Sequence, residues 1–179
     1  MATIGEKFIY FITGASGVGK TSLVNHLHKK YKNNPWAFLH FDKIGIPSAE
    51  EMIREFGSPS AWQEAKTDYW IKRLIHECTS ERIFFEGQVN LQFIRNGFAK
   101  YHFNNYRIIL IDCSETVMEK RLVHDRKQGA LFTQDMRNWL KFLRNQADEF
   151  NVAIIDSSSV SEEELRIRFE ETIELNSGS

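Results

Sequence analysis

The chain has 179 residues, enough for one domain whose core needs neither disulfides nor metals. Hydrophobic residues make up 42%, and 23 Lys and Arg nearly balance 24 Asp and Glu. This balance argues against a nucleic-acid binder driven by an overall basic field and favours a small-molecule partner, although a local basic groove stays open.

The first predicted element is a buried strand over residues 7–13, followed directly by a phosphate-binding loop. The strand reads KFIYFIT, β-branched and aromatic on both faces, as expected between two helical layers. The loop matches G-x-x-x-x-G-K-[ST] with Gly14, Ala15, Ser16, Gly17, Val18, Gly19, Lys20 and Thr21. A helix with one buried stripe should follow, because Leu23, Leu27 and Tyr31 recur every four residues.

Each fixed position of this motif has a separate task around a nucleoside triphosphate. The glycines let backbone N–H groups turn toward phosphate oxygens, and the following helix directs its positive end at the same charge. Lys20 is expected to reach the β- and γ-phosphates, and Thr21 to coordinate Mg²⁺ through its hydroxyl. The order of strand, loop and helix therefore predicts a site for ATP and Mg²⁺ rather than a flexible glycine turn.

A second strand is predicted over residues 36–42 and ends in Asp42. Ligands bind beyond the carboxyl ends of strands in open parallel sheets, so Asp42 is a candidate to orient or deprotonate an attacking hydroxyl. The alternative is a turn or cap residue before Ile44 and Gly45. Residues 42–45 also match the D-x-x-G of GTPase switches, but the chain has no N-K-x-D to recognise guanine, which disfavours a GTPase.

Residues 47–78 are predicted to form a helical insertion that binds the acceptor. Ser48 with Glu51 fits a capping box, and Ser58 before Pro59 is typical of the start of a long helix. Four residues of this helix could line a substrate pocket: Trp62, Tyr69, Trp70 and Arg73. Aromatic residues at helical spacing more often belong to the core.

A third strand over residues 82–86 ends in Glu86. Its apolar run resembles a Walker B strand, so Glu86 is a candidate to hold Mg²⁺ directly or through water; the alternative is a charge that simply emerges from the sheet edge. The next residues, 87–90, could donate amide hydrogen bonds to a substrate or cap the following helix.

A fourth strand over residues 106–112 precedes a helix and a cation-rich segment. A lid over about residues 121–135 could bring Arg121 and Arg126 over the transferred phosphoryl group, with Gly129 as a helix stop or hinge. The alternative is an exposed helix end whose cations complement the helix dipole, and this is the preferred interpretation for His124 and Lys127.

A fifth strand is predicted over residues 152–156. The next helix should begin at Ser161, because Ser161 with Glu164 fits a capping box and Val160 with Leu165 a hydrophobic staple. Five strands that alternate with helices predict the α/β class, a three-layer αβα domain over residues 1–179 with a parallel sheet.

The cysteines and the apolar runs indicate the compartment. Cys78 and Cys113 lack the paired spacing of a zinc site or redox motif, so we expect reduced structural thiols. The first residues do not read as a signal peptide, and no apolar run approaches the roughly 18 residues of a membrane span. A cytoplasmic protein without a membrane partner is expected.

Together, residues 14–21, the insertion, Glu86 and the segment with Arg121 and Arg126 resemble the small P-loop kinases, which include shikimate, gluconate, nucleoside and nucleoside-monophosphate kinases. The resemblance implies a five-stranded parallel sheet with ATP and Mg²⁺ at the loop. It also implies an acceptor that lies between the insertion and the lid, and lid arginines that contact phosphates. By the same resemblance, Asp42 faces the acceptor hydroxyl, and residues 151–159 pass beside the adenine ring.

The chain departs from this family after its third strand. Glu86, Gly87 and Gln88 stand where shikimate kinases carry a glycine triplet, and no acceptor signature of a known nucleoside kinase is present. We therefore expect an ATP-dependent phosphotransferase acting on a hydroxyl or phosphate of a small molecule. An ATP-binding or ATP-hydrolysing regulatory module and a nucleic-acid-end kinase are the alternatives. The acceptor, the choice between ATP and GTP, and the oligomeric state are not determined by the sequence.

Overall fold

The computed structural model describes residues 5–175 and forms one sheet of five parallel strands in the order β2-β3-β1-β4-β5. The strands are β1 (Phe8–Thr13), β2 (Ala37–His40), β3 (Arg82–Glu86), β4 (Tyr106–Asp112) and β5 (Ala153–Asp156). All five predicted strands form, and the predicted α/β class is confirmed. The second strand is shorter than expected because the chain turns at Phe41 into a 3₁₀ helix, η1 (Phe41–Ile44).

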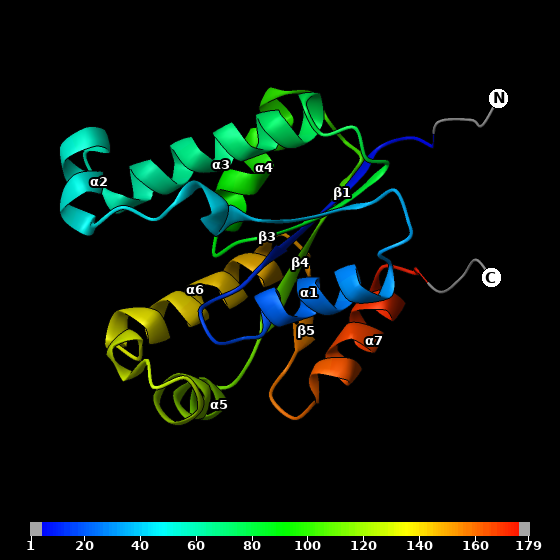
Figure 1. The fold of residues 1–179 in the computed structure, drawn as a ribbon. Helices are drawn as coiled ribbons and strands as arrows, with labels where there is room; N and C mark the ends of the chain where they lie inside the picture. The colour runs from blue at the N-terminus through cyan, green and yellow to red at the C-terminus, as the bar shows by residue number, and fades with distance from the viewer. Residues whose placement is uncertain (1–4, 176–179) are drawn as a thin grey trace.

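Within the described residues, seven α-helices connect and cover the strands (Figure 1): α1 (Lys20–Lys30), α2 (Ala49–Phe56), α3 (Pro59–His76), α4 (Leu91–Lys100), α5 (Glu115–Glu119), α6 (Gln134–Glu149) and α7 (Glu162–Thr172). Helices α3 and α4 lie on one face of the sheet, and α1 and α7 lie on the other. Figure 1 also shows α2 and the turns after α5 at the same end of the molecule, beyond the carboxyl ends of the strands.

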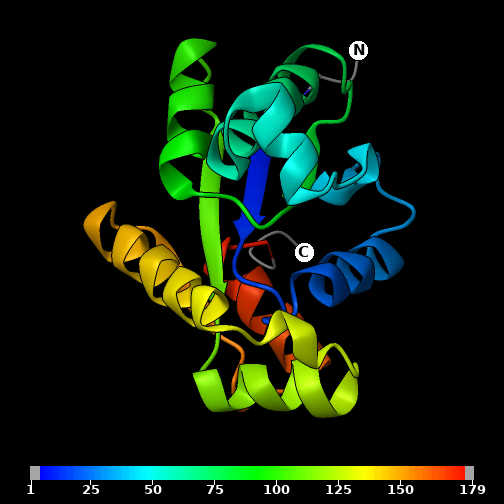
Figure 2. The same cartoon turned by 90° about the vertical axis from the view of Figure 1, so that its left-hand side faces the viewer.

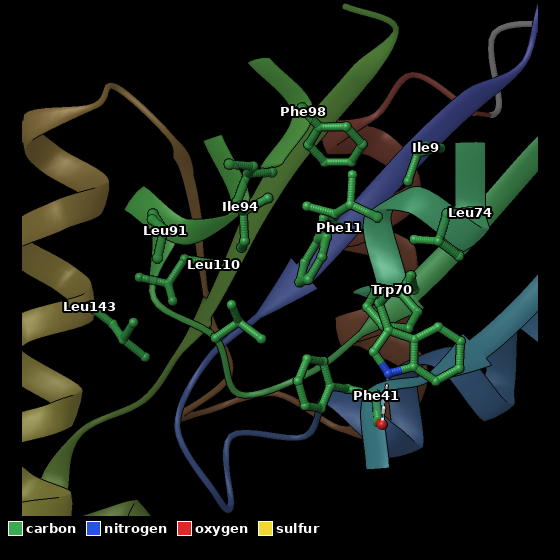
Figure 3. Close-up of a cluster of buried hydrophobic side chains, with 14 of the residues drawn as sticks. Ile9, Phe11, Phe41, Trp70, Leu74, Leu91, Ile94, Phe98, Leu110 and Leu143 are labelled. Carbon is green, nitrogen blue, oxygen red and sulfur yellow. Dashed lines mark hydrogen bonds between the residues drawn. The ribbon is translucent and has the colours of Figure 1, made fainter. Parts of the chain in front are cut away.

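Alternation along the central strand sends side chains into both layers, as predicted. Ile9 and Phe11 are fully buried in one hydrophobic cluster with Trp70 of α3, whereas Ile12 is buried in the other cluster with Leu23 of α1. Figure 3 shows the first cluster, in which the Trp70 indole N–H donates to the Phe41 carbonyl at 3.1 Å. This bond ties the helical insertion to the chain just after β2.

Two predicted helix starts are confirmed in the insertion. Ser48 and Glu51 form both hydrogen bonds of a capping box at the start of α2. The Ser58 hydroxyl accepts from Ala61 N at 3.0 Å, with proline at the first turn of α3. These caps satisfy backbone N–H groups that a helix start otherwise leaves unpaired.

The start of α7 is confirmed only in part as a capping box. Ser161 accepts from Glu164 N at 3.1 Å, but the Glu164 carboxylate contacts Arg168 at 2.8 Å instead of returning to the cap. Val160 and Leu165 pack in the same hydrophobic cluster, as the staple predicts.

The helix before the expected lid ends differently from the prediction. After α5 the chain continues as a π-helix, η2 (Lys120–Asp125), in which Arg126 N donates to the Arg121 carbonyl at 3.0 Å. The chain leaves the helix at Lys127, whose φ is 52°. Gly129 begins a separate 3₁₀ turn, η3 (Gly129–Leu131). The expectation that Gly129 stops the helix is therefore wrong, because the wide π turn ends it earlier.

None of the helices in the described part of the chain is both long and apolar enough to cross a membrane.

Candidate functional site

The phosphate-binding loop joins β1 to α1 in the conformation that its glycines permit. Gly14, Gly17 and Gly19 have φ values of 153°, 83° and 106°, and a Cβ at Gly14 would collide with the Ile111 carbonyl. Gly19 directly precedes α1, so the positive end of the dipole of this helix faces the loop.

Lys20, the first residue of α1, is buried with 8% of its surface exposed. Its ammonium group donates to the Ala15 carbonyl at 2.9 Å, within the loop itself. Burial lowers the pKa of Lys20, and the nearby carboxylates of Glu86 and Asp42 oppose this effect. No carboxylate of the described residues forms an ion pair with Lys20, and a buried cation in this state is well suited to bind an arriving anion.

Glu86 brings the ends of β2 and β3 together with the start of α1. It is 5% exposed, and its carboxylate accepts from the Thr21 hydroxyl at 3.2 Å. His40 Nδ1 lies 2.8 Å from the same carboxylate oxygen, because His40 and Glu86 are register partners on adjacent strands. No local pattern in the sequence indicates His40 as a site residue, since strand pairing alone brings it to Glu86.

Asp42 lies in η1, directly beyond the end of β2, and its side chain is exposed. No hydrogen bond or ion pair of its carboxylate is found among residues 5–175. It lines the same cavity as Lys20, Thr21 and Glu86.

This cavity has a volume of about 420 Å³ and joins three parts of the chain. Gly17, Gly19, Lys20 and Thr21 contribute the phosphate-binding side. Residues of η1, α2 and α3 form a second wall, and residues 126–131 of the expected lid form a third. Figure 2 shows the arrowhead of β1 pointing toward this lid segment, which lies between α5 and α6. Residues predicted to bind the phosphate donor and residues predicted to bind the acceptor thus line the same cavity.

The loop after β3 is held by side chains from other elements. The buried Thr13 hydroxyl donates to the Val89 carbonyl at 2.7 Å and accepts from Val89 N at 3.1 Å. Asn90 caps α4 through Gln92 N, so the predicted capping role of this loop is found. Gln88 accepts from the Ser16 hydroxyl at 2.8 Å and also lines the cavity.

The two lid arginines differ in their surroundings. Arg121 donates to the carbonyls of Gly17 and Val18 at 3.0 and 3.3 Å, and to the Ser157 carbonyl at 2.6 Å. Arg126 is exposed, makes no side-chain hydrogen bond or ion pair within the described residues, and lines the main cavity. The guanidinium of Arg121 therefore anchors the phosphate loop, while that of Arg126 is available for a ligand.

A second cavity of about 230 Å³ also borders the loop glycines Gly17 and Gly19. It is lined by Gly17, Gly19, Arg121, Ser157 and Leu165, among others. The residues after β5 therefore approach the phosphate loop.

The aromatic residues of α3 divide between core and surface. Trp62 and Trp70 are each 6% exposed in the core cluster, and Trp62 also lines the main cavity. Tyr69 and Arg73 line a neighbouring surface depression instead. Only one of the four candidates thus borders the main cavity.

The donor set at Thr21 and Glu86 is suited to Mg²⁺. Both side chains supply oxygen, which Mg²⁺ prefers, and it is usually bound by few protein groups together with substrate phosphates. No cluster of three or more His, Cys, Asp or Glu side chains that could hold a metal is found within residues 5–175. A metal held partly by phosphate oxygens fits these residues.

Comparisons with known proteins bear on the fold. The KAP family P-loop domain matches residues 1–59, about a third of the chain, and a search of curated proteins gives no match. Among solved structures, shikimate kinase from Acinetobacter baumannii in complex with shikimate is 14% identical, with a TM-score of 0.64 over 97% of this chain and 96% of that chain.

Two further structures are similar over nearly their whole length. A gluconokinase from Sinorhizobium meliloti is 15% identical, with a TM-score of 0.64 over 97% of this chain and 99% of that chain. Deoxyadenosine kinase from M. mycoides is 12% identical, with a TM-score of 0.60 over 93% and 99%. The chain therefore has the P-loop kinase fold shared by shikimate, gluconate and nucleoside kinases.

Proposed function

We propose that the protein transfers the γ-phosphoryl group of ATP to a hydroxyl group of a small molecule. The observation that carries this proposal is the single cavity of about 420 Å³ shared by Lys20, Thr21, Glu86 and Asp42. A loop that only bound a triphosphate would not need an exposed carboxylate and a wall from a helical insertion in the same space. The fold supports a nucleotide-dependent phosphotransferase in general.

In this proposal, Lys20 and the loop N–H groups bind the phosphates of ATP, because they combine a buried cation with the positive end of α1. Thr21 and Glu86 hold Mg²⁺. When bound there, Mg²⁺ would neutralise charge on the phosphate oxygens. The nucleoside part of ATP occupies the second cavity, beside Arg121 and Ser157.

On the acceptor side, Asp42 orients the attacking hydroxyl and receives its proton. The bond from the acceptor oxygen to the γ-phosphorus forms as the bond to the β,γ-bridging oxygen breaks, and ADP leaves. Arg126 stabilises the charge on the transferred group when the lid closes. We assign Arg121 a structural role rather than contact with the transferred group, since its guanidinium donates to the carbonyls of Gly17 and Ser157.

ADP release tests the proposal with a panel of hydroxylated metabolites, nucleosides, nucleotides and aminoglycosides. We expect at least one compound to raise ADP formation above the rate with water alone. If every compound leaves that rate unchanged while ATP still stabilises the protein, the proposal fails and the chain is better regarded as an ATP-dependent regulatory module.

The variant Asp42→Asn tests the acceptor side. Acceptor-dependent ADP release should fall about 100-fold or more, because the amide cannot receive the proton, whereas the melting temperature should not change. Asp148→Asn, an exposed carboxylate in the last turn of α6, is the matched control and should behave as wild type. An equal loss in both variants, or none in Asp42→Asn, would contradict the assigned role.

A further inference from the structure

The acceptor side of the main cavity is built largely from apolar side chains. Six of its lining residues are apolar: Phe41, Ile46, Met52, Pro59, Trp62 and Leu131. Ile46 and Leu131 are 55% and 41% exposed. They line the same cavity although they lie far apart in the sequence. Large exposed apolar side chains that meet at one cavity are typical of a binding surface.

Among the described residues, the cavity lining offers no Lys or Arg side chain that could pair with an acidic acceptor once ATP is bound. Lys20 and Arg126 are the Lys and Arg residues that line it, and both are needed by the phosphates of ATP under the proposed function. Asp42 and Glu86 line the same space with two carboxylates. An anionic acceptor would therefore lose its hydration beside two like charges without gaining an ion pair.

Other cations of this region lie outside the cavity. Lys43, Lys66 and Arg73 line the neighbouring surface depression, which shares Ile46 and Trp62 with the cavity. The ammonium group of Lys66 lies 5.4 and 5.8 Å from the ring centres of Phe56 and Tyr69, and the Arg73 guanidinium lies 5.6 Å from that of Tyr69. These contacts hold both cations over aromatic faces rather than beside the acceptor.

Neutral amides are the remaining polar groups of the acceptor side. Gln63 is committed to the loop after β3, since it donates to the Gln88 carbonyl at 3.1 Å and accepts from Asn90 N at 2.9 Å. Gln88 accepts from Ser16, and its NH₂ group has no partner within the described residues. Gln128 of the lid makes no side-chain hydrogen bond there either. Both amides can hydrogen-bond uncharged oxygen or nitrogen atoms of a ligand.

We infer that the acceptor is an uncharged hydroxyl compound with an apolar or aromatic ring system, rather than a carboxylic acid or a phosphate ester. This inference rests on the proposed function and adds the chemical class of its second substrate. The ring packs against Trp62 and its apolar neighbours, and the hydroxyl faces Asp42.

Pairs of a neutral compound and a related anionic compound test the inference. The pairs are thymidine with thymidine monophosphate, adenosine with adenosine monophosphate, and methyl shikimate with shikimate. Two measurements are made on the full chain: acceptor-dependent ADP release with ATP, and the shift in melting temperature in the presence of the non-hydrolysable analogue AMP-PNP. We expect the neutral member of at least one pair to bind and react about tenfold better or more than its anionic partner.

The two measurements separate failure of the inference from failure of the proposed function. Anionic members that bind better, or neutral members that give no melting shift at all, overturn the inference. If neutral members bind in the presence of AMP-PNP but never raise ADP release, the inferred chemical class of the ligand holds and the phosphotransferase proposal is overturned.

A charge placed on the acceptor wall gives a second, independent test. Ile46→Arg should shift the preference toward the anionic members by about tenfold, because it supplies the missing cation. Ile53→Arg is the matched control, since Ile53 is also 55% exposed but does not line the cavity. Equal effects of the two variants, or no change in Ile46→Arg, would contradict the location of the acceptor.

Discussion

At the scale of single residues, Lys20 combines two properties that are in conflict unless a ligand is bound. It is buried, which lowers its pKa, and within residues 5–175 its ammonium group has only the Ala15 carbonyl as a hydrogen-bond acceptor. A buried, unpaired ammonium group lowers the stability of the folded protein, and a bound polyphosphate would offset this cost by pairing with the charge. These properties support the proposal that Lys20 serves ligand binding rather than folding.

The variant Lys20→Met should separate these two effects. The unliganded melting temperature should stay the same or rise, because an apolar side chain replaces a buried cation. Stabilisation by ATP, about 2.7 kcal/mol at a ligand concentration of 100 Kd for a functional site, should be lost. Thermal melting with and without ATP measures both. Lys29→Met, at an exposed position of the same helix, should keep the ATP shift; an unchanged shift in Lys20→Met would refute the phosphate-loop assignment.

Cys113 gives a prediction on pH at the same scale. This thiol, directly after β4, is 1% exposed, and burial raises its pKa from 9.0 to about 11. It stays protonated in the folded state at a pH at which the unfolded chain already ionises. Its contribution to stability is thus complete below about pH 9 and is lost as the pH rises to about 11.

The free energy of unfolding should therefore fall between about pH 9 and 11 by about 2–3 kcal/mol more in wild type than in Cys113→Ala. Denaturant titrations at several pH values measure this difference, and other ionisations cancel in the comparison. Curves that stay parallel for the two proteins would show that the thiol titrates equally in both states.

At the scale of elements, the strands and the lid differ in how far local sequence determines them. Strands β1 and β3 are apolar on both faces, so their burial pattern appears directly in the sequence. The end of η2 follows instead from π-type bonds such as that from Arg126 N to the Arg121 carbonyl. No residue type is specific for that bond, which explains why Gly129 was wrongly expected to end the helix.

The two lid arginines should separate into a structural and a ligand-binding residue. Arg121→Leu removes charge-assisted bonds to three carbonyls and should cost about 2–3 kcal/mol, or about 4–12 °C in melting temperature. Arg126→Leu should keep the melting temperature of wild type and lower kcat about 100-fold or more. Thermal melting and ADP release measure both variants. A stability loss in Arg126→Leu, or none in Arg121→Leu, would contradict this division.

At the scale of the whole molecule, the helical insertion is part of the main core rather than a separate body. Trp70, Ile71 and Leu74 of α3 are buried in one cluster with Phe11 and Phe85 of the sheet (Figure 3 shows Trp70, Leu74 and Phe11). The Lys7 ammonium group also bonds the carbonyls at the end of α3, which joins this helix to the start of β1.

Unfolding should consequently be a single cooperative transition. Far-ultraviolet circular dichroism reports mainly the helices, and tryptophan fluorescence includes Trp62 and Trp70 of the insertion. In a denaturant titration the two midpoints should coincide. A fluorescence change that precedes the loss of helical signal would indicate that the insertion unfolds on its own.

The sequence by itself determined the five strands, the phosphate loop, and the placement of Asp42 near the end of β2 and Glu86 at the end of β3. Each of these depends on residues adjacent in the chain: apolar alternation, a glycine pattern, or a carboxylate directly after an apolar run. The roles of the predicted site residues remain predictions that the variants above test.

Only the tertiary structure decided which side chains meet. It brought His40 to Glu86 through strand register, Arg121 to the Ser157 carbonyl, and Ile46 and Leu131 to one cavity. These pairs are separated by tens of residues, and their contact depends on how helices pack on the sheet, which local sequence patterns do not encode. The proposed donor half of the site is thus determined by a local motif, whereas the proposed acceptor half depends on packing between distant segments.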